Sequence, residues 1–179
     1  MISFADSKFT VMENKKTDKN IQANLFSANT ATVLAALNSL KEKGNKAYLP
    51  PLFDLLNSSP EPEIETEILF ILNNLKIKDA VPVLVEALQN SKYLPIRKKL
   101  TTACWENGLD YKNYLPVFVD LVIQENWDTG FEAFTVIENM ESFPEQEIVE
   151  IAKNKIYDAL KNAGEQKKYF LHEILTLIR

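Results

Sequence analysis

Three segments of the chain repeat one another: LPPLFDLL from residue 49, VPVLVEAL from residue 81 and LPVFVDLV from residue 115. Pro50, Pro82 and Pro116 coincide in this frame, at spacings of 32 and 34 residues. A self-similar period of this length is typical of repeat architectures, in which each unit buries its apolar face against its neighbours. Because proline fits the first turn of a helix, where its missing N–H leaves no bond unmade, each segment is predicted to begin a short helix.

Longer helices are predicted between these segments. Apolar residues recur at steps of three and four, at positions 64, 68, 71 and 75 in one helix and at 96, 100 and 103 in the next. The stretches SSPEPE and SKYLPIR, with capping serines and early prolines, mark where these helices begin. The unit is therefore two antiparallel helices, A then B. The predicted hairpins cover residues 30–57, 61–90, 94–125 and 128–162, and a capping helix covers residues 165–178.

Glycine usage supports an all-α fold. The chain has four glycines, where average usage of about 7% would give about a dozen, and tight β-hairpins would require more. Gly44, Gly108 and Gly164 each follow an amphipathic stretch. We expect these three residues to end helices in the left-handed conformation, which a residue without Cβ adopts at no steric cost.

The N-terminal part differs from the rest. Residues 1–27 are polar, lysine-rich and weakly periodic, which predicts a partly ordered arm ahead of a repeat domain over residues 28–179. The single cysteine cannot form an internal disulfide, and no secretory signal is visible near the N-terminus. The longest apolar runs fall short of the roughly 18 to 20 residues that cross a bilayer. We therefore expect a soluble, cytoplasmic protein.

The segment EIETEILFILNNLKIKDAVPVLVEAL resembles the HEAT-like repeat of the phycobilin-lyase type. The residues that match its pattern are Ala80, Val81, Pro82, Leu84 and Leu88, with Ile96 and Arg97 in the next unit. The resemblance covers about residues 30–163, although Asn73 stands where the family has glycine and some A-to-B loops are longer. It implies an α-solenoid, a right-handed superhelix with the B helices on its concave side. It implies no particular activity, because such folds carry many functions.

Asp54, Glu86 and Asp120 occupy equivalent positions on successive B helices. If the B helices line the concave side, as the resemblance implies, this acidic row forms a track for a basic partner. The alternative is that one polar position per helix must face water in any case.

Trp105, Tyr111, Trp127 and Phe131 lie in neighbouring helices and loops of the third and fourth units. Exposed aromatic side chains in a cluster mark contact sites, because they are over-represented among residues that carry binding energy. The alternative is that these aromatic residues pack the ridge between the two units.

The sequence lacks the residue combinations that common catalytic mechanisms require. Cys104, the only cysteine, follows Leu100 by four positions and is expected to pack inward as a small hydrophobe, far along the chain from His172, the only histidine. This pair cannot supply a conventional zinc site, and no phosphate-binding glycine loop is present. We therefore expect a non-catalytic chain with no metal or cofactor.

Two charge patterns predict local structure only. The glutamates at 61, 63, 65 and 67 fall on different flanks of a helix, which favours a solvated helix start over a divalent-cation site. Arg97 aligns with Glu65 and Glu132 on successive A helices. Stacking of the units is therefore predicted to let Arg97 bridge at least one of these acids.

The charge distribution favours a protein or peptide partner. Residues 47–179 carry thirteen bases against twenty-one acids, a net charge of −8, which disfavours binding to nucleic-acid phosphates. The main hypothesis is therefore a protein-interaction or scaffold module. One alternative is an enzyme acting on damaged DNA bases, by analogy with HEAT-like proteins, with roles for Trp105, Trp127, Asp110 and Asp128. Another is self-association through the apolar C-terminal stretch YFLHEILTLI.

Overall fold

The structure, a computed structural model, describes residues 18–43 and 45–179, and within these ranges the chain forms helices and turns but no strand. The α-helices are α1 (Lys19–Leu25), α2 (Thr30–Lys43), α3 (Leu49–Asn57), α4 (Pro62–Asn73), α5 (Val81–Gln89), α6 (Arg97–Glu106), α7 (Leu115–Gln124), α8 (Trp127–Glu138), α9 (Gln146–Leu160) and α10 (Glu165–Leu177). Short 3-10 helices precede four of them: η1 (Lys46–Tyr48), η2 (Lys78–Ala80), η3 (Ser91–Ile96) and η4 (Lys112–Tyr114). The predicted all-α class is confirmed for this part of the chain.

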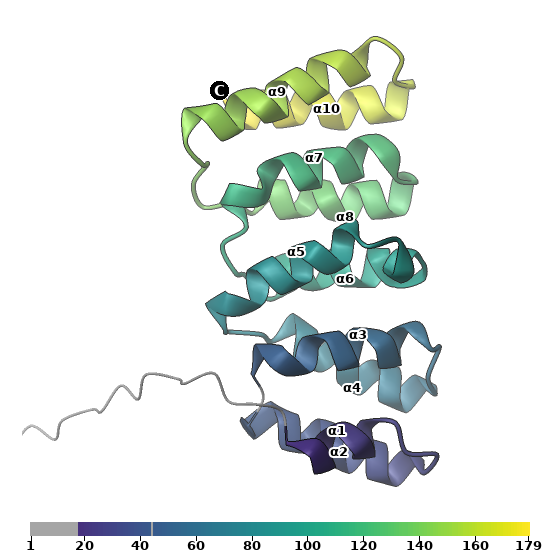
Figure 1. Cartoon of the computed structure of the whole chain (residues 1–179). Coiled ribbons are helices and arrows are strands. Elements are labelled where there is room, and N and C mark those ends of the chain that lie inside the picture. Colours follow the sequence, from purple (N-terminus) through teal and green to yellow (C-terminus); the bar gives the residue numbers. More distant parts are fainter. Residues whose placement is uncertain (1–17, 44) are drawn as a thin grey trace, which may run out of the picture.

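The helices lie in two rows of a layered stack (Figure 1). The odd row holds α1, α3, α5, α7 and α9, and the even row behind it holds α2, α4, α6, α8 and α10. Each even helix contacts the next even helix along the chain. Successive layers therefore follow the order of the sequence, and the core runs between the two rows from one end of the stack to the other.

The repeated prolines begin odd-row helices, as their frame predicts. Each lies in the first turn of its helix, Pro50 in α3, Pro82 in α5 and Pro116 in α7. Two residues after each proline, Leu52, Leu84 and Phe118 are at most 1% exposed. The proline thus sets where the helix begins, and the spacing from it sets which face enters the core.

The first end of the stack contains α1 and the other end contains α10. At the first end, the Asp18 carboxylate caps α1 by accepting from the backbone N of Asn20 at 2.8 Å, and Leu25 is fully buried. The backbone N of Asp18 donates to Tyr48 Oη at 2.6 Å, which ties this end to the start of α3. The predicted arm is therefore helical over residues 19–25, and its residues 1–17 lie outside the described ranges.

The helix ends only partly follow the glycine prediction. Gly108 has φ +65° just after α6, which confirms its left-handed conformation. Gly164 has φ −70°, so the prediction for it is wrong: it is the N-cap of α10, where extended backbone leads into the next helix. Gly44 lies outside the described residues.

Within residues 18–43 and 45–179, no helix combines the length and the apolar character that a membrane crossing requires.

Candidate functional site: acidic row, aromatic cluster and pocket

Two of the three acids in the predicted row have cations of the chain itself beside them. Asp54 accepts from Tyr93 Oη at 2.7 Å and forms an ion pair with Lys92 at 2.5 Å. Asp120 binds Lys155 of α9, with both carboxylate oxygens 2.9 Å from Nζ. The third acid, Glu86, is exposed and has no partner among the described residues.

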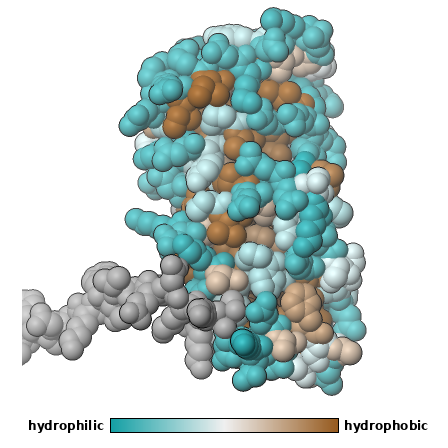
Figure 2. Space-filling view, viewed as in Figure 1, coloured by the Kyte–Doolittle hydropathy of each residue, from teal (hydrophilic) through white to brown (hydrophobic). Residues whose placement is uncertain are grey.

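The electrostatics of Asp54 reflect these contacts. Partial burial by itself raises the pKa of its carboxyl, but the hydrogen bonds from Lys92 and Tyr93 outweigh burial and hold the pKa below its ordinary value. The side of the odd row has hydrophobic residues in separate patches between hydrophilic ones (Figure 2). Glu86 is the one acid of the predicted row without a cation beside it among the described residues. The row is therefore not a continuous acidic track.

Tyr111 is not available to a partner at the surface. Its side chain is 2% exposed, and its ring packs edge-on against Phe118 with centroids 5.6 Å apart. Its hydroxyl hydrogen-bonds with Asn107, also buried, at 3.0 Å. The prediction of Tyr111 as an exposed contact residue is therefore wrong, because the turn after Gly108 directs this side chain into the core.

Trp105 links two helices of the even row. It is partly buried on α6, and its Nε1 donates to Glu132 Oε2 of α8 at 2.7 Å. Trp105 therefore packs between the third and fourth units while leaving part of its ring accessible.

Trp127 and Phe131 form a half-exposed aromatic cluster with α10. Their rings surround Phe170, with centroids 4.6 and 6.1 Å from its ring. Phe170 is 4% exposed, whereas Trp127 and Phe131 are 46% and 49% exposed, and Tyr169 beside them is 60% exposed. We call Trp127, Phe131 and Tyr169 around Phe170 the aromatic cluster. It lies on even-row helices, whereas the acidic row lies on odd-row helices, so the two predicted features belong to different rows of the fold.

A charge pattern that the motif search missed spans residues 113–152. This stretch holds nine acids and no lysine, arginine or histidine. Five of the acids contact side chains of the described residues: Asp120, Glu125, Asp128, Glu132 and Glu150. The other four have no side-chain partner there: Glu138, Glu141, Glu145 and Glu147. Counting charge in a sliding window would have found this base-free segment.

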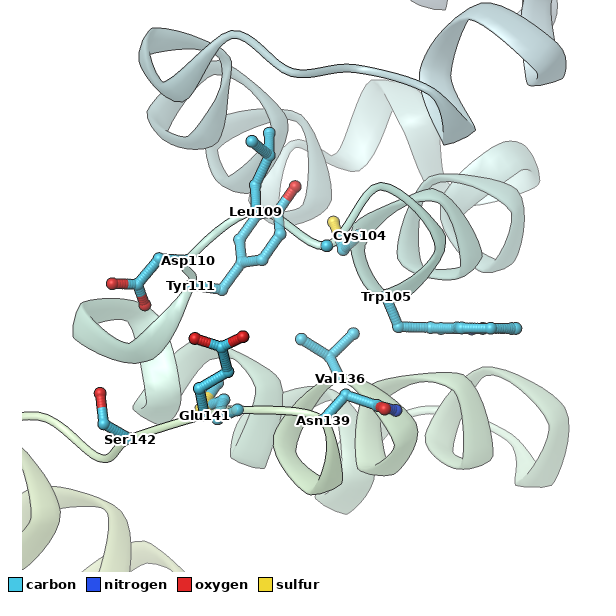
Figure 3. A pocket seen from close by; sticks show the side chains of 11 residues that line it. Cys104, Trp105, Leu109, Asp110, Tyr111, Val136, Asn139, Glu141 and Ser142 are labelled. Carbon is cyan, nitrogen blue, oxygen red and sulfur yellow. The ribbon is translucent and has the colours of Figure 1, made fainter.

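A pocket of about 260 Å³ opens between the end of α6 and the end of α8 (Figure 3). Buried Tyr111 and Val136 form part of its wall, and Trp105 lines another side. Its polar lining includes Asp110, Asn139, Glu141 and Ser142. The accessible lining of the pocket is therefore more polar than apolar, and it includes carboxylates from two loops.

The lone cysteine has a structural role. Cys104 is 1% exposed on α6, which confirms the prediction that it packs inward. Burial raises the pKa of its thiol to about 12, against a smaller opposing effect of a hydrogen bond with Tyr111. A thiol that stays protonated at neutral pH is a poor nucleophile. His172 lies on α10, exposed to solvent.

Arg97 does not form the predicted bridge to Glu65 or Glu132. It pairs with Glu125, the C-cap of α7, while Glu65 pairs with Lys99 at 2.8 Å. Arg97 is the first residue of α6, and helical side chains lean toward the N-terminus. The guanidinium therefore reaches back toward the end of α7 rather than along the even row.

Three of the four glutamates at the start of α4 have partners, each a different residue, and the fourth, Glu63, is exposed. Glu61 accepts from Thr30 Oγ1 at 2.8 Å, and Glu65 and Glu67 pair with Lys99 and Lys41. Within the described ranges no group of histidine, cysteine or acidic side chains is arranged to hold a metal ion.

The residues considered for DNA-base chemistry do not converge. Trp105 and Asp110 line the pocket near the end of α8, whereas Trp127 and Asp128 begin that helix. Asp110 has Lys112 at 3.4 Å, and Asp128 has Lys98 at 3.3 Å.

Most of the apolar C-terminal stretch packs inside the chain's own fold. Phe170, Leu171, Ile174 and Ile178 are at most 4% exposed, and Leu177 is 38% exposed. Tyr169 and Leu177 are the residues of this stretch that keep large exposed apolar area, so most of its apolar side chains are already used within the chain.

Comparison with known proteins adds no family assignment. No protein-family model matches the chain, and no curated protein matches its sequence. The inferences below therefore rest on the geometry of the chain itself.

Proposed function

We propose that the chain is a short HEAT-like α-solenoid, a right-handed superhelix of A and B helices. The two rows of stacked helices and the prolines that begin α3, α5 and α7 support this architecture. In such folds each unit contacts only its neighbours, and α1 and α10 supply the outer faces that terminal units need.

Its proposed role is that of a non-catalytic, cytoplasmic module that binds a protein or peptide. The aromatic cluster carries this proposal. Trp127 and Phe131 are about half exposed although Trp127 stacks on the buried Phe170 ring and Phe131 contacts it at a tilt, so their side chains are held in place while presenting apolar area to solvent. Aromatic residues held in this way lose little entropy on binding and commonly dominate interface energies.

Charge supports a partner with basic residues. The base-free segment supplies α7, α8 and the first part of α9, and four of its acids have no side-chain partner among the described residues. Carboxylates without a paired cation attract opposite charge and speed association with it. The same carboxylates repel phosphate, which disfavours the nucleic-acid alternative.

Absence of catalysis is also part of the proposal. It is supported by the buried, protonated thiol of Cys104 and by the exposed position of the only histidine, on a different helix. Self-association through α10 is disfavoured because most of its apolar side chains are already buried.

The test is affinity capture from a lysate of the source cell with three versions of the protein. We expect wild type to retain a partner that the double variant Trp127→Ala, Phe131→Ala loses. Tyr157→Ala is the matched control, because Tyr157 is an exposed aromatic residue on α9, outside the aromatic cluster. Equal capture by wild type and the double variant would show that the aromatic cluster is not the contact surface. Capture of nothing by folded wild type would contradict the binding role.

A further inference from the structure

One layer away from the pocket between α6 and α8, the chain places one of its own lysines at the end of a helix. Lys76, three residues after the end of α4, donates from Nζ to the carbonyl of Asn107, the C-cap of α6, at 2.9 Å. The residue three positions after the end of α6 is Leu109, and the C-cap of α8 is Asn139. Leu109 and Asn139 both line the pocket. The Leu109 side chain points away from Asn139 (Figure 3) and packs against the core, and no lysine among the described residues donates to the Asn139 carbonyl.

Helix geometry makes the pocket favourable for a cation. The pocket is lined by Trp105 and Gly108 at the end of α6 and by Asn139 just after the end of α8. The carbonyl ends of helices carry partial negative charge, which stabilises cations near them. Lys76 at the end of α6 is an instance of this interaction within the chain.

The side chains add a net negative charge. Glu141 has no partner among the described residues, and its carboxylate points toward Tyr111, between Asp110 and Val136 (Figure 3). Asp110 pairs with Lys112 at 3.4 Å, and Lys112 Nζ lies 3.4 Å from Ser142 Oγ. Asp110 and Lys112 offset one another, so Glu141 leaves one unbalanced negative charge in the pocket lining.

We propose that this pocket binds the basic side chain of a lysine or arginine in the partner. The inference rests on the proposed function and names the partner's chemistry. A basic side chain has an apolar stem that fits beside Trp105 and Met140, which line the pocket and are partly buried, and a cation that reaches Glu141. The charge-assisted bond to that carboxylate supplies affinity that a neutral side chain lacks.

The chain contains two tryptophans, so two indole N–H signals report on binding by nuclear magnetic resonance. Trp105 lines the pocket and Trp127 lies at the other end of α8, and a Trp127→Phe variant assigns the two signals. The probes are the Nα-acetyl amides of lysine, arginine and citrulline, the last being neutral and similar in shape to arginine. We expect saturable shifts of the Trp105 signal with lysine or arginine amide and none with citrulline amide. The tighter of the two cations identifies the side chain.

Two variants test the assignment of groups. Glu141→Gln should weaken binding about tenfold or more, because it removes the carboxylate of a charge-assisted hydrogen bond. Glu147→Gln is the matched control and should bind as wild type does, since Glu147 is another exposed acid without a side-chain partner in the described ranges.

The proposal is overturned if citrulline amide shifts the Trp105 signal equally, if Glu141→Gln binds unchanged, or if no probe gives a saturable shift. These results are separable from a failure of the proposed function. A captured partner that Glu141→Gln retains would refute the pocket and leave the binding role standing. Binding of the basic amides without any captured partner would support the pocket and contradict the binding role.

Discussion

Arg97 and Glu125 form an ion pair between the first residue of α6 and the C-cap of α7, with side chains only 13% and 21% exposed. Arg97→Ala should lower the free energy of unfolding by about 1 to 3 kcal/mol, because it leaves a mostly buried carboxylate without its cation. Urea denaturation followed by far-ultraviolet circular dichroism measures the change.

The control for this pair is Lys161→Ala, which breaks the exposed Lys161–Asp158 pair, 70% and 80% exposed. We expect its urea midpoint to match that of wild type, because water screens and solvates exposed ions. Equal effects of the two substitutions would show that burial of the Arg97 pair contributes nothing to stability.

One substitution should have opposite effects at two glycines. Gly108→Ser should destabilise the protein by about 1 kcal/mol, because φ +65° is strained for a residue with a Cβ. Gly164→Ser should stabilise it by about 0.5 kcal/mol, because an N-cap serine accepts from free N–H groups of α10. An added Cβ meets nothing within 4 Å at either position, so backbone conformation and capping decide the difference.

Thermal unfolding of both variants measures these effects. A destabilised Gly164→Ser variant would contradict the assignment of Gly164 as an N-cap.

Alkaline pH should destabilise the fold through Cys104. Burial raises the pKa of its thiol from 9.0 to about 12, so above pH 9 the unfolded chain loses this proton while the folded chain keeps it. The raised pKa stabilises the folded state below pH 9, and this stabilisation is lost as the pH rises toward 12. The unfolding free energy should fall by about 1.4 kcal/mol between pH 8 and pH 10 for this reason. Cys104→Ala should show a correspondingly smaller decrease in unfolding free energy over that interval. Parallel pH profiles for wild type and variant would contradict the buried thiol.

The helix pattern was predictable from the sequence because its causes are local. Proline fixes the first turn in α3, α5 and α7, and the spacing from each proline places Leu52, Leu84 and Phe118 in the core. The end of α6 was predictable for the same reason, since Gly108 adopts a conformation that other residues avoid. The role of Gly164 was not predictable, because a glycine between two helices can either end the first helix or serve as the N-cap of the second.

The partners of individual side chains were not predictable, because they depend on how the layers rotate and shift against each other. Alignment placed Arg97 beside Glu65 and Glu132, but its position at the start of α6 turns it toward Glu125. Asp120 appeared free in the sequence because Lys155, its partner, lies 35 residues away on a helix outside the proline frame. Tyr111 appeared exposed because a turn residue gives no periodic signal of burial.

The aromatic cluster supplies the last prediction. Phe170→Leu keeps an apolar side chain at a site that is 4% exposed but removes the ring on which Trp127 and Phe134 stack, with centroids 4.6 and 5.0 Å away. We expect a loss of about 1 to 2 kcal/mol in unfolding free energy, the sum of lost ring contacts and imperfect repacking. Near-ultraviolet circular dichroism should weaken in the tryptophan region, because Trp127 loses the contact that orients it. Tyr169→Leu is the control, since a side chain that is 60% exposed contributes little packing and should change neither measurement appreciably. An unchanged tryptophan signal in Phe170→Leu would show that Phe170 does not hold Trp127 in place, and the aromatic cluster would lose the rigidity on which its proposed binding role depends.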